Sequence, residues 1–188
     1  MAKTIEDIAN EVLLEADLTS KDLPDLDLYI DQITTLFDRT FENHKRTEED
    51  KIITKAMVNN YCKKGVVEPI SGKKYSKDRI IEMLLVYNLK NTLMIDEIQR
   101  LLAPVYKLKE QGEFDICQFY DELIELKSSQ KQSIIDSMEQ IIAANSQLNL
   151  ENEETRLRTI LILASLSDAY RVAAQKIIDE YYPNDKKK

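Results

Sequence analysis

The side chains with the clearest chemical potential lie in one forty-residue stretch of the sequence. Residues 51–90 contain nine Lys or Arg and three acidic residues, a net charge of +6, whereas the other 148 residues carry −14. Lysine and arginine displace condensed counterions from nucleic acids, so a basic segment in an acidic chain is typical of a surface that faces phosphates. The alternative is a solvated face that only keeps the domain soluble.

Two amide side chains and a glycine turn accompany these charges. Asn59 and Asn60 can hydrogen-bond adenine N6 and N7 in a bidentate way, or can satisfy only backbone groups. Gly72 predicts a tight turn, flanked by Lys73 and Lys74. The candidate DNA-binding residues are Lys55, Asn59, Asn60, Lys63, Lys64, Lys73, Lys74 and Tyr75.

The sequence offers little for catalysis or for metal binding. His44 is the single histidine, so neither a Ser-His-Asp or Cys-His pair nor a zinc site of ordinary spacing is supported. Cys62 stands beside Lys63, which could lower its pKa as in a redox sensor, but a free cysteine packed at a helix edge is the simpler interpretation. We therefore expect that the protein is not an enzyme and that it binds neither a cofactor nor a metal ion. We assign no role to Cys62 or Cys117.

The composition indicates a mostly helical chain. Three glycines and four prolines are few for 188 residues, and sheet proteins need more turn-forming residues. Hydrophobic residues make up 43% and charged residues 32%, enough for a buried core under a soluble surface. The two cysteines are far apart, the start is acidic, and no apolar run approaches about 18 residues. We expect a cytoplasmic protein with no membrane partner.

Hydrophobic periodicity predicts the elements that position the basic stretch. Amphipathic helices are expected within residues 4–18 and 28–43. The segment "ITKAMVNNYCKKG" predicts a helix that Thr54 caps and Gly65 ends. Residues 66–75 predict an extended arm, a turn and a return arm, which form a two-stranded wing. A helix over residues 77–90, opened by Ser76 or Asp78, is apolar almost all round and should be buried.

Further helices follow along the chain. Residues 92–104 predict a helix that Pro104 limits, and three more are expected over residues 114–129, 131–146 and Glu153–Tyr181. The last has apolar positions on more than one face. Tyrosines in this part could line an effector pocket or could be core and rim residues. A boundary near Gln111-Gly112 would separate a winged-helix DNA-binding-like domain, residues 1–111, from a helical dimerisation or effector domain, residues 112–188.

The order of the residues also resembles known families. The segment "MVNNYCKKGVVEPISGKKYSKDRIIEMLLVYNLKNTLMIDEIQRLL" is similar to the DNA-binding half of the MerR-type regulators. The positions that fit are Tyr61, Gly65, Val66, Val67, Pro69, Tyr75, Ser76, Ile80, Leu84, Leu89, Ile95, Asp96, Glu97, Ile98, Leu101 and Leu102. This resemblance implies a recognition helix in the major groove and a wing on the phosphate backbone. The fragments "DLDLYIDQI", "ITKAMVNNY" and "KKYSKDRI" also resemble domain of unknown function 1836, which brings no activity.

The sequence leaves two function classes open. The first is a MerR-like transcriptional regulator that binds double-stranded DNA as a homodimer through its C-terminal helices, with an unidentified small-molecule effector. The second is a non-enzymatic protein–protein interaction module built on a winged-helix fold. In both cases the expected fold class is all-α, with a winged helix-turn-helix and its small two-stranded wing followed by a C-terminal helical bundle. Binding to DNA that falls steeply with salt would separate the two functions.

Overall fold

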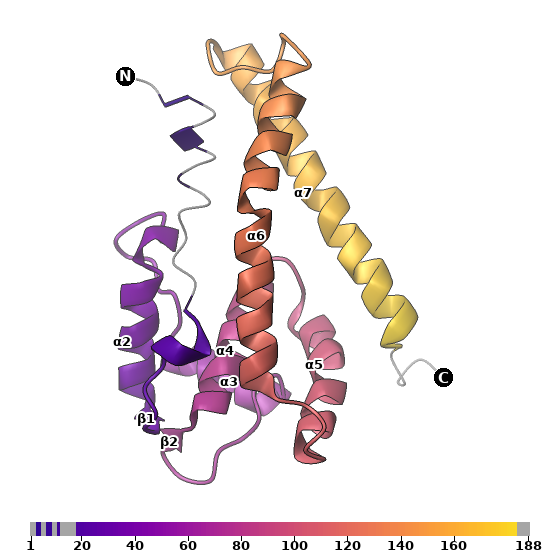
Figure 1. The fold of residues 1–188 in the computed structure, drawn as a ribbon. Helices are drawn as coiled ribbons and strands as arrows, with labels where there is room; N and C mark the ends of the chain where they lie inside the picture. Colours follow the sequence, from indigo (N-terminus) through magenta and orange to yellow (C-terminus); the bar gives the residue numbers. More distant parts are fainter. Residues whose placement is uncertain (1–2, 5–6, 9–10, 12–17, 184–188) are drawn as a thin grey trace. The chain divides into compact units, whose positions relative to one another are not determined.

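The chain is mainly helical, as its composition predicts (Figure 1). The computed structural model describes residues 3–4, 7–8, 11 and 18–183. In chain order the elements are η1 (Ser20–Asp22), β1 (Leu28–Tyr29), α2 (Ile30–Thr40), η2 (Glu42–His44), α3 (Lys55–Lys64), β2 (Lys74–Tyr75), α4 (Lys77–Leu89), α5 (Ile95–Glu110), α6 (Ile116–Ala143) and α7 (Glu153–Tyr181). Most of the helix expected within residues 4–18 lies outside the described residues.

Contacts along the backbone divide the chain into two compact units. We call residues 16–124 and 174–188 the core unit, and residues 1–15 and 125–173 the hairpin unit. The helices α6 and α7 each contribute to both units. The domain boundary expected near Gln111-Gly112 stays a prediction.

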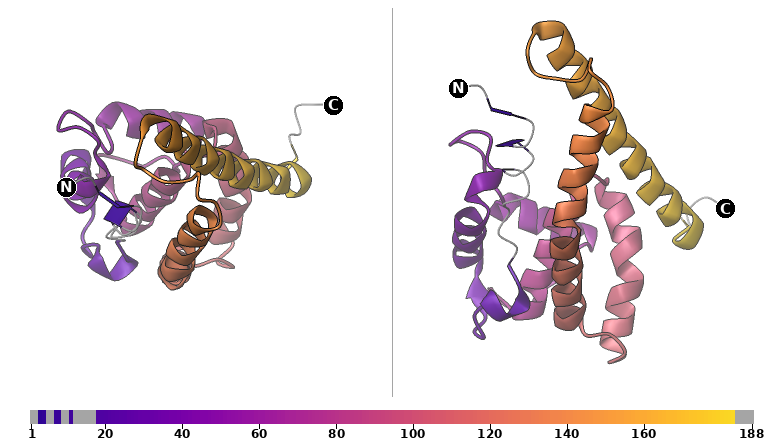
Figure 2. Two further views of the ribbon diagram at one scale, coloured as in Figure 1. Left: turned by 90° about the horizontal axis from the view of Figure 1, so that it is seen from above. Right: turned by 45° about the horizontal axis from the view of Figure 1, so that its top comes forward.

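The centre of the core unit is α4, which lies between α2 and α5 (Figure 2). The residues of α4 with no exposed surface are Ile80, Ile81, Glu82, Met83, Leu84 and Val86. A helix that is apolar on all sides is stable only when other elements surround it. One such contact joins Phe37 of α2 to Tyr87 of α4, with ring centroids 6.1 Å apart in an edge-to-face arrangement. The prediction of a buried central helix is confirmed.

The helix α3 begins and ends at the residues that its sequence predicts. The Thr54 hydroxyl accepts a hydrogen bond from the backbone N–H of Met57, 3.1 Å away. Gly65 follows the helix with φ = +68°, a left-handed conformation that glycine adopts at little cost. Val58 and Tyr61 are buried against the core. The capped helix therefore has one anchored side and one exposed side.

The sequence predicts that two strands within Val66–Tyr75 pair with each other as a wing, and this prediction is wrong. The strand β2 forms there, but its partner is β1, which precedes α2 in the chain. The two strands pair antiparallel, with Leu28 opposite Tyr75 and Tyr29 opposite Lys74. The sheet therefore joins the segment after α3 to the segment before α2.

The first arm of the expected wing forms no strand because other groups bind its backbone. The Val66 carbonyl accepts a hydrogen bond from the buried Tyr106 hydroxyl, 2.7 Å away. The Glu68 N–H donates to the Glu82 carboxylate at 2.9 Å, and Pro69 has no N–H to donate. Few backbone N–H and C=O groups of this arm are therefore left to form hydrogen bonds with a neighbouring strand.

The helix α5 continues past Pro104, contrary to the sequence-based expectation. A proline inside a helix removes one backbone hydrogen bond. Residues beyond Pro104 make compensating contacts, because Tyr106 binds Val66 and the Lys109 ammonium lies 2.7 Å from the Glu82 carboxylate. These contacts to distant parts of the chain hold the last turns of α5 in place.

The two helices expected over residues 114–129 and 131–146 form one helix, α6. The predicted joint at Ser128-Ser129-Gln130 contains neither glycine nor proline, so nothing in it terminates a helix. The Ser129 hydroxyl donates to the Leu126 carbonyl at 2.8 Å, which satisfies the side chain within the helix. The following helix, α7, has the predicted bounds.

Candidate nucleic-acid interface

The exposed side of α3 gathers five of the candidate residues. They are Lys55, Asn59, Asn60, Lys63 and Lys64, and all five are exposed. Residues separated by three or four positions share one side of a helix. The opposite side is fixed by Val58, which has no exposed surface, and by Tyr61. The three lysines and two asparagines therefore occupy the exposed half of a helix whose other half is held against the core, with Lys55 and Lys64 at the two edges of that exposed half.

The two-stranded sheet adds a tyrosine that the sequence did not indicate. Side chains alternate across a strand, so Leu28 and Tyr75 point inward while Tyr29 and Lys74 share the outer face. The Lys74 ammonium lies 5.1 Å from the centre of the Tyr29 ring, a cation–π contact. Tyr29 is 48% exposed, whereas Tyr75 is 6% exposed and belongs to the core. No local pattern predicts Tyr29 here, because its strand is only two residues long.

An ion pair connects this sheet to α3. The Lys55 ammonium lies 2.5 Å from the Asp31 carboxylate. Asp31 belongs to the first turn of α2, which directly follows Tyr29 in β1. Lys73 is exposed beside Gly72, whose φ of +116° marks the turn. We call the following residues the basic surface: Tyr29, Lys55, Asn59, Asn60, Lys63, Lys64, Lys73 and Lys74.

Several cations of the basic stretch are bound within the protein and do not contribute to the basic surface. Lys77 pairs with Asp25 at 2.9 Å, and the Lys90 ammonium donates to the Ile52 carbonyl at 2.7 Å. Lys63 and Lys73, by contrast, have no ion-pair partner among the described residues. These two lysines are the basic surface's clearest candidates for contact with an external anion.

A charge cluster surrounds the buried Glu82 of α4, and we call it the buried charge cluster. It consists of Glu68, Arg79, Glu82 and Lys109. The Lys109 ammonium lies 2.7 Å from Glu82 and 2.6 Å from Glu68, and the Arg79 guanidinium bonds both carboxylates. Burial raises the pKa of Glu82. Burial also acts to raise the pKa of Glu68, but hydrogen bonds from Lys109 and Arg79 outweigh it and lower that pKa. The cluster fixes the segment around Glu68 to α4 and α5.

The cysteines lack the environment of a reactive thiolate. Burial raises the pKa of the Cys62 thiol, and the charge of Glu82 raises it further. Burial, followed by the nearby Asp78 carboxylate, raises the pKa of Cys117 to about 11. Neither shift has the direction that a redox sensor requires. The interpretation of Cys62 as a packed cysteine is therefore favoured.

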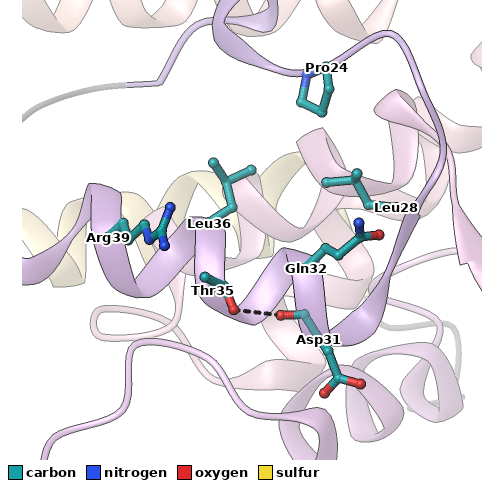
Figure 3. A pocket seen from close by; sticks show the side chains of 7 residues that line it. All are labelled: Pro24, Leu28, Asp31, Gln32, Thr35, Leu36 and Arg39. Carbon is teal, nitrogen blue, oxygen red and sulfur yellow. Dashed lines mark hydrogen bonds between the residues drawn. The ribbon is translucent and has the colours of Figure 1, made fainter.

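A surface pocket of about 440 Å³ borders the basic surface (Figure 3). It is lined by Pro24, Leu28, Asp31, Gln32, Thr35, Leu36 and Arg39. The Thr35 hydroxyl donates to the Asp31 carbonyl at 2.8 Å, while the carboxylate of the same Asp31 binds Lys55. The lining has no histidine or cysteine, so it has no nucleophile–base pair of the usual kind.

Other chemical sites are not evident in the described part of the chain. Within residues 3–4, 7–8, 11 and 18–183, no three His, Cys, Asp or Glu side chains are grouped to hold a metal ion. His44 Nδ1 lies 2.6 Å from the Tyr87 hydroxyl in a partly buried contact. None of the helices that the structure describes is both long and apolar enough to cross a membrane.

Comparison with known proteins identifies one family. A family model described as "Domain of unknown function (DUF1836)" matches residues 18–123, which is more than half of the chain. The matched segment contains the whole basic surface and the buried charge cluster. No curated protein and no solved structure matches the chain.

Proposed function

We propose a DNA-binding function for this chain, which belongs to the DUF1836 family. The proposal rests on one observation: α3 presents three lysines and two asparagines on its exposed side, while Val58 and Tyr61 anchor the other. An α-helix fits the major groove of DNA, and lysines beside it neutralise phosphates. The protein is then a transcriptional regulator of MerR-like type.

The parts of the basic surface take different roles in this proposal. Asn59 and Asn60 contact base edges in the major groove, where an asparagine can bond adenine N6 and N7. Lys63 contacts a phosphate beside the groove. Lys73 and Lys74, at the turn between Gly72 and β2, contact the backbone next to it. The turn takes the place of a wing, although its strand pairs with β1.

A specific observation favours a second candidate function, a protein–protein interaction module. Two of the lysines on α3 already have acidic partners, because Lys55 pairs with Asp31 and Lys64 lies 3.5 Å from Asp96. A surface of mixed charge suits a protein partner that carries both signs. In this case the helix α3 contacts a protein in place of DNA.

The decisive experiment measures binding to labelled genomic DNA fragments by fluorescence anisotropy at several salt concentrations. We compare the wild type with Lys63→Glu/Lys73→Glu. Losing two phosphate contacts should weaken binding to all sequences and flatten the plot of log K against log salt by about 0.9 per contact.

The matched control is Lys107→Glu/Lys176→Glu, which changes the net charge equally at exposed positions outside the basic surface. It should retain most of the affinity. If the wild type binds no DNA, or if the Lys63/Lys73 variant binds as tightly as the wild type while folded, the protein-binding function is the better account.

A further inference from the structure

The middle of α7 is uncharged on every side. Residues 159–167, "TILILASLS", contain no Asp, Glu, Lys or Arg. At 3.6 residues per turn, nine residues pass around the helix more than twice. Such a segment is typical of a helix that other elements surround. In this structure, however, no residue from Ile160 to Tyr170, all of which are described, is buried.

One side of this segment forms a stripe of large apolar residues. Leu157, Ile160, Leu161 and Ala164 follow the spacing of three and four residues that lines one side of a helix. The first three are 57%, 60% and 58% exposed. We call these four residues the α7 stripe. Ile162, one position along, is directed about 100° away from Leu161 and lies outside the stripe.

The charges that flank the stripe balance within the helix. The pairs are Glu153 with Arg156, Glu154 with Arg158, and Asp168 with Arg171. Residues 153–171 contain three acidic and three basic residues, so their net charge is zero in a chain of −8. Two copies of an acidic protein repel each other over most of their surfaces. Two copies that meet through residues 153–171 do not have this repulsion at the contact, because the net charge of that segment is zero.

We propose that the α7 stripe is the contact surface of a homodimer and that its occupant is the α7 stripe of a second copy. A twofold contact places the same patch of both protomers together, and a neutral apolar patch is compatible with itself. The proposal does not depend on DNA binding. If both hold, the dimer carries two basic surfaces and can contact two half-sites.

The test measures the mass of the full chain by sedimentation equilibrium at micromolar concentration. The wild type should be a dimer. Leu161→Glu should raise the dimer dissociation constant about 100-fold or more, because two new carboxylates then face each other across the contact. Ile162→Glu is the matched control, with the same change on another side of the helix. It should leave the dissociation constant nearly unchanged.

Several outcomes would overturn the proposal. A monomeric wild type would mean that another segment of this chain, or a different partner, covers the stripe. A Leu161→Glu variant that remains a dimer would place any dimer contact elsewhere. Because Leu161 is more than half exposed, the substitution should not unfold the helix, and circular dichroism verifies this for both variants.

Discussion

The carboxylate of Glu82 accepts a hydrogen bond from the backbone N–H of Glu68 at 2.9 Å, although the two residues belong to different parts of the core unit. Glu82 is completely buried in α4, and Glu68 lies in the segment between α3 and β2. This bond and the salt bridges around it hold that segment in a non-strand conformation. The position of Lys73 and Lys74 therefore depends on a buried charge several residues away.

Removing the Glu82 carboxylate should destabilise the fold strongly. Glu82→Ala leaves Arg79, Lys109 and the Glu68 N–H without their buried partner, which should lower the free energy of unfolding by about 3–5 kcal/mol. Glu82→Gln should cost less, because its amide oxygen still accepts a hydrogen bond. Urea denaturation measures both. Glu110→Ala, at an exposed position of α5, is the control and should stay within about 0.5 kcal/mol of the wild type.

The pH dependence of stability should contain a contribution from Glu68. Its pKa is lowered in the folded state by Lys109 and Arg79, against the opposing effect of burial. Its contribution is therefore present above its unfolded pKa of about 4.3 and is lost as the pH falls through the folded value. Burial raises the pKa of Glu82, so the contribution of Glu82 to stability changes in the opposite direction and is lost as the pH rises.

Comparison with Glu68→Gln isolates the Glu68 contribution. Between about pH 4.5 and pH 3, the unfolding midpoint of the wild type should fall more steeply than that of the variant. Urea denaturation at each pH gives the two curves. Parallel curves would contradict the assignment of a lowered pKa to Glu68.

Cys117 should react slowly with thiol reagents in the folded protein. With a pKa of about 11, about one thiol in a thousand is ionised at pH 8. In a Cys62→Ser variant, the remaining thiol should react with a disulfide reagent on the order of 100-fold more slowly than after unfolding in urea. The rate should rise about tenfold per pH unit up to about pH 11. A fast reaction at pH 7 would show that the thiol is not shielded as described.

Replacing either asparagine of the basic surface should change sequence preference. Asn59→Ala or Asn60→Ala should weaken binding by about 1–3 kcal/mol on the preferred DNA sequence and leave binding to other sequences unchanged. The preferred sequence is obtained by selection from random duplexes. Both side chains are exposed, so stability should be unaffected. An equal loss on all sequences would mean that the asparagines contact the backbone and not the bases.

Residues whose conformation depends on near neighbours were predictable from the sequence. Thr54 and Gly65 delimit α3 because capping needs only the adjacent backbone. The bounds of α7 and the burial of α4 follow from the local order of apolar and polar residues. The exposed lysines and asparagines of α3 were predictable for the same reason, since their positions follow from the helix and its buried side.

Other features were decided only by contacts between residues far apart in the chain. β2 pairs with β1 because hydrogen bonds to Tyr106 and Glu82 occupy the backbone of the nearer arm. Tyr29 enters the basic surface through that pairing, opposite Lys74, while Tyr75, opposite Leu28, is buried. A strand of two residues has no sequence periodicity of its own, so its partner is determined by the tertiary structure that supplies the missing hydrogen bonds.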